Sequence, residues 1–120
     1  MVKCLEEEGV TRIFGYPGVA ISPFYEALYN AGTIEHVLVR QERAAGHAAS
    51  GYARISRKAA VCVTSSGPGA TNLITALATA YADSIPLIAI TGQVNSNLLG
   101  RDVFQEADMR GSTESFVKYS

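Results

Sequence analysis

Four short apolar runs, at residues 12–15, 35–39, 60–64 and 86–91, recur about every 25 residues, and each is followed by a polar or glycine-containing turn. Runs of this length suit buried strands, and the stretches between them have helical spacing. An alternation of strand and helix at this interval is typical of a parallel sheet with right-handed crossovers. The sequence therefore predicts an α/β fold, a mostly parallel sheet flanked by helices.

Three helices are predicted between the strands, from Ser22 to near Gly32, over 42–55 and over 70–82. The second carries a stripe of mostly small residues, which lets another backbone approach closely. The third has polar groups but no charge on its outer side, so we expect it to be covered on both sides. In a domain this small, we expect the second cover to come from another chain.

Beyond Gly92 the pattern weakens. Residues 98–109 mix charged side chains with isolated apolar ones, which fits either a short helix or an ordered active-site segment. Phe116 and Val117 look like the opening of another strand. We therefore expect a domain that lacks its last strand or helix.

Composition limits the functions open to this chain. Its 120 residues, 48% of them hydrophobic, can bury one core. Ten basic and eleven acidic residues give a net charge of −1 with no basic block, which argues against binding nucleic acid. No apolar run approaches the roughly 20 residues that span a bilayer. We expect a soluble, cytoplasmic protein with small-molecule or protein partners and no membrane segment.

Several single residues are expected to be structural. Cys4 and Cys62 have no partner at metal-ligand spacing, so we expect no zinc site or disulfide and two partly buried side chains. His36 is interpreted as a surface or strand-end residue and His47 as a structural or interface residue. No Gly-x-Ser-x-Gly motif is present, so nucleophilic hydrolase chemistry has no support.

Two glycine-containing loops follow predicted strands at the end of the sheet where parallel α/β folds bind ligands. The first is Gly-Tyr-Pro-Gly at 15–18, which fits either a ligand-lining loop or a plain turn. The second, at 65–72, leads into a helix, where backbone amides can hold an anion. It does not match the dinucleotide motif, because Asn72 stands at the third glycine position and Pro68 removes an amide. A nucleotide site is therefore a weak alternative.

Glu42 directly follows the second predicted strand and opens the alanine-rich helix. At helical spacing it shares an inward-facing stripe with Ala45 and Ala49, which favours a functional carboxylate. A glutamate in the first turn also complements the helix dipole, with Arg40 or Arg43 as an ion-pair partner. Composition alone leaves both interpretations open.

Six motifs occur in the order found in acetolactate synthases, which are thiamine-diphosphate enzymes, and this resemblance covers essentially the whole chain. Any one motif is only suggestive, whereas six in order are highly specific. The motifs are Phe-Gly-Tyr-Pro-Gly at 14–18, Glu42 with His-Ala-Ala-Ser-Gly-Tyr-Ala-Arg at 47–54, Ser-Gly-Pro-Gly-Ala-Thr-Asn at 66–72, Asp-Ser-Ile-Pro at 83–86, Ile-Thr-Gly-Gln-Val at 90–94 and Phe-Gln-Glu at 104–106.

The resemblance implies a thiamine-diphosphate-binding fold in which residues 1–120 form an incomplete N-terminal, pyrimidine-binding domain. It implies that the carboxylate of Glu42 is catalytic, hydrogen-bonding N1′ of the aminopyrimidine so that the cofactor can lose its thiazolium C2 proton. The remaining site residues implied are Tyr16, Pro17, Gly18, Pro68 and Asn72 beside the cofactor, and Phe104 and Gln105 near the reacting carbon and the flavin of biosynthetic members.

The activity implied is decarboxylation of pyruvate and its condensation with a second 2-oxo acid, giving 2-acetolactate when the acceptor is pyruvate. Mg²⁺ and the diphosphate would be held by a diphosphate-binding domain of the same or a partner chain, in a homodimer or larger assembly, and FAD is a candidate second cofactor. The isolated 120 residues are expected to be inactive. Two alternatives stay open, a non-catalytic dimerisation or regulatory module of this family and a nucleotide- or flavin-binding α/β module.

Overall fold

The computed structural model describes residues 1–120 and contains one four-stranded sheet in the order β2-β1-β3-β4. All neighbouring strands run parallel, which confirms the predicted fold class. The outer strands β2 and β4 leave β1 and β3 in the middle, and every residue of β3 is buried. The strands are β1 (Arg12–Gly15), β2 (Glu35–Leu38), β3 (Ala60–Thr64) and β4 (Leu87–Thr91).

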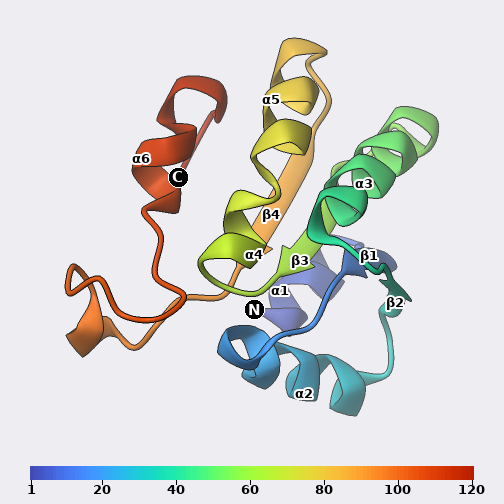
Figure 1. The fold of residues 1–120 in the computed structure, drawn as a ribbon. Helices are drawn as coiled ribbons and strands as arrows, with labels where there is room; N and C mark the ends of the chain where they lie inside the picture. Colours follow the sequence, from blue (N-terminus) through green and yellow to red (C-terminus); the bar gives the residue numbers. More distant parts are fainter.

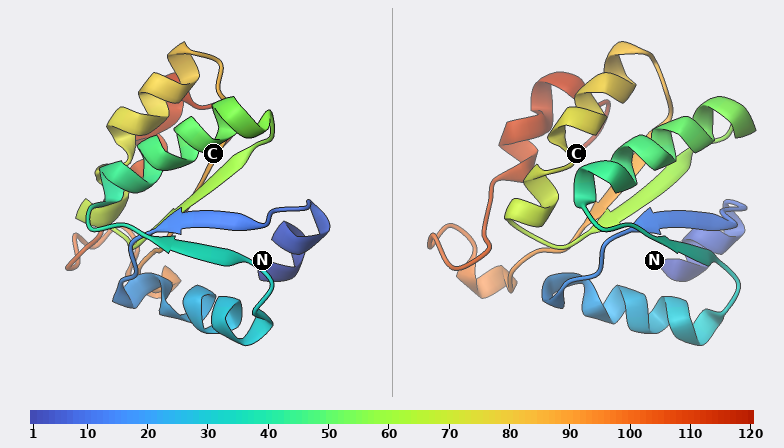
Figure 2. Two further views of the ribbon diagram at one scale, coloured as in Figure 1. Left: turned by 90° about the vertical axis from the view of Figure 1, so that its right-hand side faces the viewer. Right: turned by 45° about the vertical axis from the view of Figure 1, so that its right-hand side comes forward.

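Helices cover both faces of this sheet, as Figure 2 shows. One face packs on α1 (Val2–Glu7) and α2 (Ser22–Ala31) through a core that includes Ile13 and Val61. The other packs on α3 (Glu42–Ser56) and α5 (Ile74–Ala82) through a core that includes Phe14 and Cys62. Alternate residues of β1 and β3 enter opposite cores, because successive side chains of a strand point to opposite faces.

The predicted helix at 70–82 is broken into α4 (Pro68–Thr71) and α5. The hydrogen-bond pattern tightens at the break, where the Leu73 amide donates to Ala70 O, before the Leu77 amide resumes helical spacing by donating to Leu73 O. Leu73 is fully buried, and Asn72 beside it bonds to another element. Tertiary contacts therefore interrupt a stretch that has helical spacing throughout.

The C-terminal part differs most from expectation. Between β4 and α6 (Met109–Thr113), the only helical segment is the 3-10 turn η2 (Ser96–Leu98). Residues 99–108 therefore form an irregular segment and not the short helix that was one of the two expectations. The prediction of a strand that starts at Phe116 is wrong, because Glu114–Phe116 forms a turn of 3-10 helix, η3. Phe116 packs against the core between α3 and α5. Figure 1 shows α6 beside α5, so part of the second cover expected for α5 comes from this same chain.

Candidate functional site

Glu42 begins α3 at the edge where the strands end. Gln41 caps this helix, because its Oε1 accepts a hydrogen bond of 3.2 Å from the amide of Ala44. Glu42 is half-buried, and its carboxylate pairs with neither Arg40 nor Arg43. The expected ion pair is therefore wrong, whereas Glu42 does lie in the first turn of α3, where a carboxylate complements the helix dipole.

That carboxylate receives one hydrogen bond from the glycine-containing loop. Nδ2 of Asn72 donates to Oε2 of Glu42 over 2.9 Å, while Oε1 accepts no hydrogen bond within the chain. Oε1 faces Gly69, where an added Cβ would lie only 3.4 Å from it. Glycine therefore keeps one carboxylate oxygen uncovered while asparagine orients the other.

Ser65 connects this carboxylate to the loop after β1. A Cβ on Gly18 would lie 2.5 Å from Cβ of Ser65, and a Cβ on Gly69 would lie 3.4 Å from the same atom. The hydroxyls of Ser65 and Ser66 are buried with no hydrogen-bond partner. Buried polar atoms are nearly always paired, so these two are candidates for a ligand contact. Sequence reasoning missed both serines, although two hydroxyls directly after a predicted buried strand were a usable signal.

The loop after β1 holds the other predicted cofactor contacts. The amide of Tyr16 donates to Val63 O, and the Tyr16 side chain is 40% exposed. Pro17 and Gly18 line a hollow of about 390 Å³ together with Val19, Ser22 and Tyr25. Through Gly18 and Ser65, the structure brings this loop against the loop that carries Pro68 and Asn72.

Gln105 reaches the same place from the C-terminal part. Gly67 has φ of +55°, and a Cβ there would lie 2.6 Å from the carbonyl carbon of Gln105 and 2.7 Å from its Cα. The Gln105 backbone thus lies directly on the glycine-containing loop. The side chain of Phe104 is 87% exposed, so only Gln105 of this predicted pair contacts the loop.

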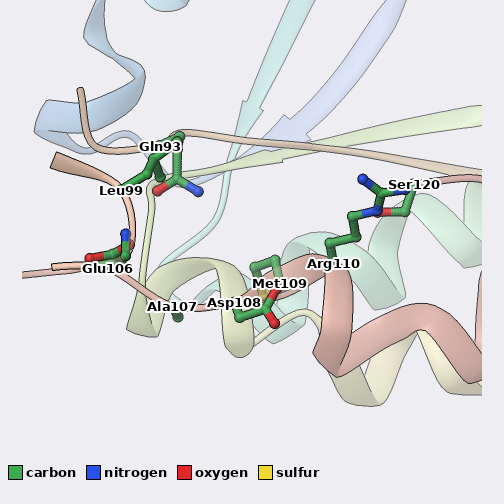
Figure 3. Close-up of a pocket in the computed structure, with 9 residues that line it drawn as sticks. Gln93, Leu99, Glu106, Ala107, Asp108, Met109, Arg110 and Ser120 are labelled. Carbon is green, nitrogen blue, oxygen red and sulfur yellow. The ribbon is translucent and has the colours of Figure 1, made fainter. Parts of the chain in front are cut away.

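A larger hollow, of about 520 Å³, lies between the segment around Leu99 and Glu106 and the start of α6, as Figure 3 shows. Its lining includes Asp108 and Arg110 but neither Glu42 nor Asn72. We place the candidate site at Glu42, because there an unpaired carboxylate oxygen, orphaned hydroxyls and two glycine-containing loops meet.

A second polar cluster, formed by His36, Tyr25 and the carbonyl of Gly15, lies beside β1 and β2. Nε2 of His36 lies 3.3 Å from Gly15 O and 3.4 Å from the hydroxyl of Tyr25. Burial lowers the pKa of His36 and raises the pKa of Tyr25. His36 is therefore a half-buried strand residue that contacts the start of the Tyr16 loop, where sequence reasoning placed a surface or strand-end residue.

The two cysteines and His47 differ in their exposure. Cys62 is buried and burial raises its pKa to about 12, but Cys4 is exposed, so only one of the two thiols is buried as expected. His47 is exposed on α3. No group of three or more His, Cys, Asp or Glu side chains is placed to hold a metal ion. No helix combines the length and apolar character needed to cross a membrane.

A parallel α/β domain that gathers a helix-initial carboxylate, an amide and two glycine-containing loops at its strand ends belongs to the class of cofactor-binding α/β domains. More particularly, residues 1–112 match the family described as thiamine pyrophosphate enzyme, N-terminal TPP binding domain, and the chain belongs to that family. The resemblance drawn from the six motifs is thereby confirmed.

Curated relatives agree with this family. The chain is 57% identical over its 120 residues to a probable acetolactate synthase large subunit of Methanocaldococcus jannaschii, of which it covers 20%. It is 52% identical to acetolactate synthase large subunits of Corynebacterium glutamicum and Haemophilus influenzae, of which it covers 19% and 21%. All 120 residues align in each case, so the chain spans about a fifth of the length of these relatives.

Proposed function

We propose that this chain is the pyrimidine-binding domain of an acetolactate synthase and that Glu42 is its catalytic residue. The observation that carries the proposal is the state of the Glu42 carboxylate, with Oε2 bound by Asn72 and Oε1 free beside Gly69. A carboxylate held in this way suits a ring nitrogen that must share a proton. The relatives' names supply the product, acetolactate, and pyruvate with a second small 2-oxo acid is the substrate pair that belongs to this proposal.

The residues present fit thiamine diphosphate. Glu42 would hold N1′ of the aminopyrimidine, and the loops at Tyr16, Pro17 and Gly18 and at Pro68 would line the ring. The unpaired hydroxyls of Ser65 and Ser66 offer further polar groups in the loop that also carries Pro68. When bound, the cofactor supplies the carbanion that attacks a 2-oxo acid.

The protein's own contribution is orientation and proton control. Asn72 keeps Oε2 occupied, so Oε1 is the atom that would accept a hydrogen bond from N1′ when that nitrogen is protonated. Gly69 leaves the approach to Oε1 open, because it has no side chain. Gly18 permits the contact with Ser65 that joins the two loops. These features would hold a planar ring in one orientation relative to Glu42.

The remaining parts of the proposal concern groups outside these 120 residues. We propose that a diphosphate-binding domain of the same or a partner chain binds Mg²⁺ and the diphosphate, in a homodimer or larger assembly in the cytoplasm. We also propose that FAD, where the complete enzyme binds it, lies near Phe104 and Gln105 of this chain.

The test is Glu42→Gln in the complete enzyme, with exchange of the cofactor's C2 proton followed by NMR. We expect exchange to slow by about 10²-fold or more, because removing a positioned acid–base group costs on that order. Glu26→Gln is the matched control, since Glu26 is exposed on α2. Unchanged exchange in Glu42→Gln would contradict the proposal and favour the non-catalytic module.

A further inference from the structure

The segment before α6 contains a turn that is held together by one carboxylate. Glu106 accepts hydrogen bonds from the backbone amides of Gly100, over 2.5 Å, and Val103, over 3.2 Å. These bonds lower the pKa of Glu106. Two amides three residues apart are thus tied to one side chain that follows them in sequence.

The backbone of this turn has several positive φ angles and makes few hydrogen bonds of its own. Gly100, Asp102 and Gln105 have φ of +77°, +52° and +62°, in the left-handed region that non-glycine residues rarely adopt. The backbone amides of residues 99–106 donate three hydrogen bonds to other backbone groups, from Leu99 to Ser96 O, from Arg101 to Leu98 O and from Glu106 to Val103 O. Strained backbone of this kind persists when surrounding contacts enforce it, and the Glu106 carboxylate supplies such contacts.

The turn ends on the candidate site. Gln105, next to Glu106, lies with its backbone against Gly67, and Gly67 directly precedes Pro68 at the start of α4. Movement of the turn would therefore uncover Gly67, and the loop from Ser65 to Asn72 would lose a neighbour on that side.

We propose that Glu106 is a positioning residue that clamps the 100–105 turn so that Gln105 packs on Gly67 and orders the loop around the Glu42 site. Glu106 acts through Gln105 and the glycine-containing loop, and it does not itself touch the carboxylate of Glu42. The link to cofactor binding rests on the proposed function, whereas the clamp itself is a property of the chain.

The test compares Glu106→Gln and Glu106→Ala with Glu114→Gln in the complete enzyme, since Glu114 is an exposed glutamate of η3. Hydrogen–deuterium exchange is measured for peptides covering 98–107 and 65–70. We expect Glu106→Ala to raise exchange in both by about tenfold or more, with a smaller rise for Glu106→Gln, because a neutral amide is a weaker acceptor. Glu114→Gln should leave both unchanged.

Two further measurements separate positioning from general loss of structure. The melting temperature and the exchange of β3 should stay at wild-type values in the Glu106 variants, while the dissociation constant for thiamine diphosphate rises about tenfold. Unchanged exchange at 98–107 would overturn the clamp, and a rise there without one at 65–70 would overturn the link to the site. If the wild-type enzyme does not bind thiamine diphosphate, the proposed function fails, and the exchange data still decide the clamp.

Discussion

Asn72 shows how one side chain prepares a site. Its amide donates to one oxygen of Glu42 and leaves the other open, so the carboxylate has a fixed orientation before any ligand arrives. Bonds to charged acceptors are roughly twice as strong as neutral ones, so this contact constrains the carboxylate although Asn72 is exposed.

Asn72→Ala and Asn72→Asp should both impair the site, and the aspartate should impair it more. Alanine removes the donor, and we expect about tenfold slower exchange of the cofactor's C2 proton in the complete enzyme. Aspartate also removes the donor, and it places a second negative charge next to the Glu42 carboxylate, which repels it. Asn30→Asp on α2 is the control, since Asn30 is exposed on the other face of the sheet. Equal exchange in Asn72→Asp and wild type would contradict this role.

His36 should make the domain less stable in acid. Burial lowers its pKa in the folded state, so the unfolded chain binds more protons as the pH falls below about 6.5. The stability that His36 contributes is fully present above that pH and is lost as the pH falls through the lowered pKa of the folded state.

Urea denaturation of the 120-residue chain between about pH 8 and pH 5 checks this sign. His36→Gln should lose less stability than wild type over that interval, because glutamine does not titrate. His47→Gln is the matched control, since it removes a histidine that is exposed on α3. A wild-type pH dependence in His36→Gln would show that His36 is not the group responsible.

At the scale of elements, the contact between α3 and α5 depends on a missing side chain. A Cβ on Gly46 of α3 would lie 2.5 Å from Cβ of Ala76 on α5. The small-residue stripe seen in the sequence is therefore confirmed as a close helix approach. This approach also carries Glu42, at the start of α3, toward Asn72, just before α5.

Two glycines of α3 should respond to alanine in opposite directions. Gly46→Ala should destabilise the fold by about 1–3 kcal/mol, because overpacking outweighs the gain in helix propensity. Gly51→Ala should stabilise it by about 0.5–1 kcal/mol, because nothing lies within 4 Å of its added Cβ. Urea midpoints of the two variants measure the difference. A stabilising Gly46→Ala would mean that the helices separate at little cost.

At the scale of the whole molecule, several large apolar side chains are left open to solvent. Val19, Tyr29, Ile55 and Phe104 are each 87% exposed, and they lie on different sides of the sheet. The chain also spans only about a fifth of its relatives. Both observations support the proposal that these surfaces meet other parts of a larger enzyme.

The 120-residue chain by itself should form no acetolactate from pyruvate in the presence of thiamine diphosphate and Mg²⁺. The proposed site holds only the pyrimidine end of the cofactor, so the diphosphate would lack its binding domain. A product assay on the isolated chain, with circular dichroism to check that it is folded, measures this. Turnover comparable to that of the complete enzyme would overturn the division of the cofactor between two domains.

Much of the fold was predictable, because parallel strands and crossover helices are specified by local apolar spacing. Both β1 and β3 have the predicted bounds, and α3 begins at the predicted Glu42. The break between α4 and α5 was not predictable, since residues 70–82 have helical spacing throughout and the break coincides with a tertiary contact, the Asn72–Glu42 bond.

The fold class and the family could be read from the sequence, which also singled out Glu42 as the candidate carboxylate, because motifs and periodicity are properties of the linear chain. Three contacts become visible only in the folded chain: Asn72 orients Glu42, Ser65 joins two loops and Glu106 holds the turn on Gly67. Those contacts depend on how crossovers and turns bring distant backbone segments together. The spacing of residue types along the chain does not give the distance in space between such segments.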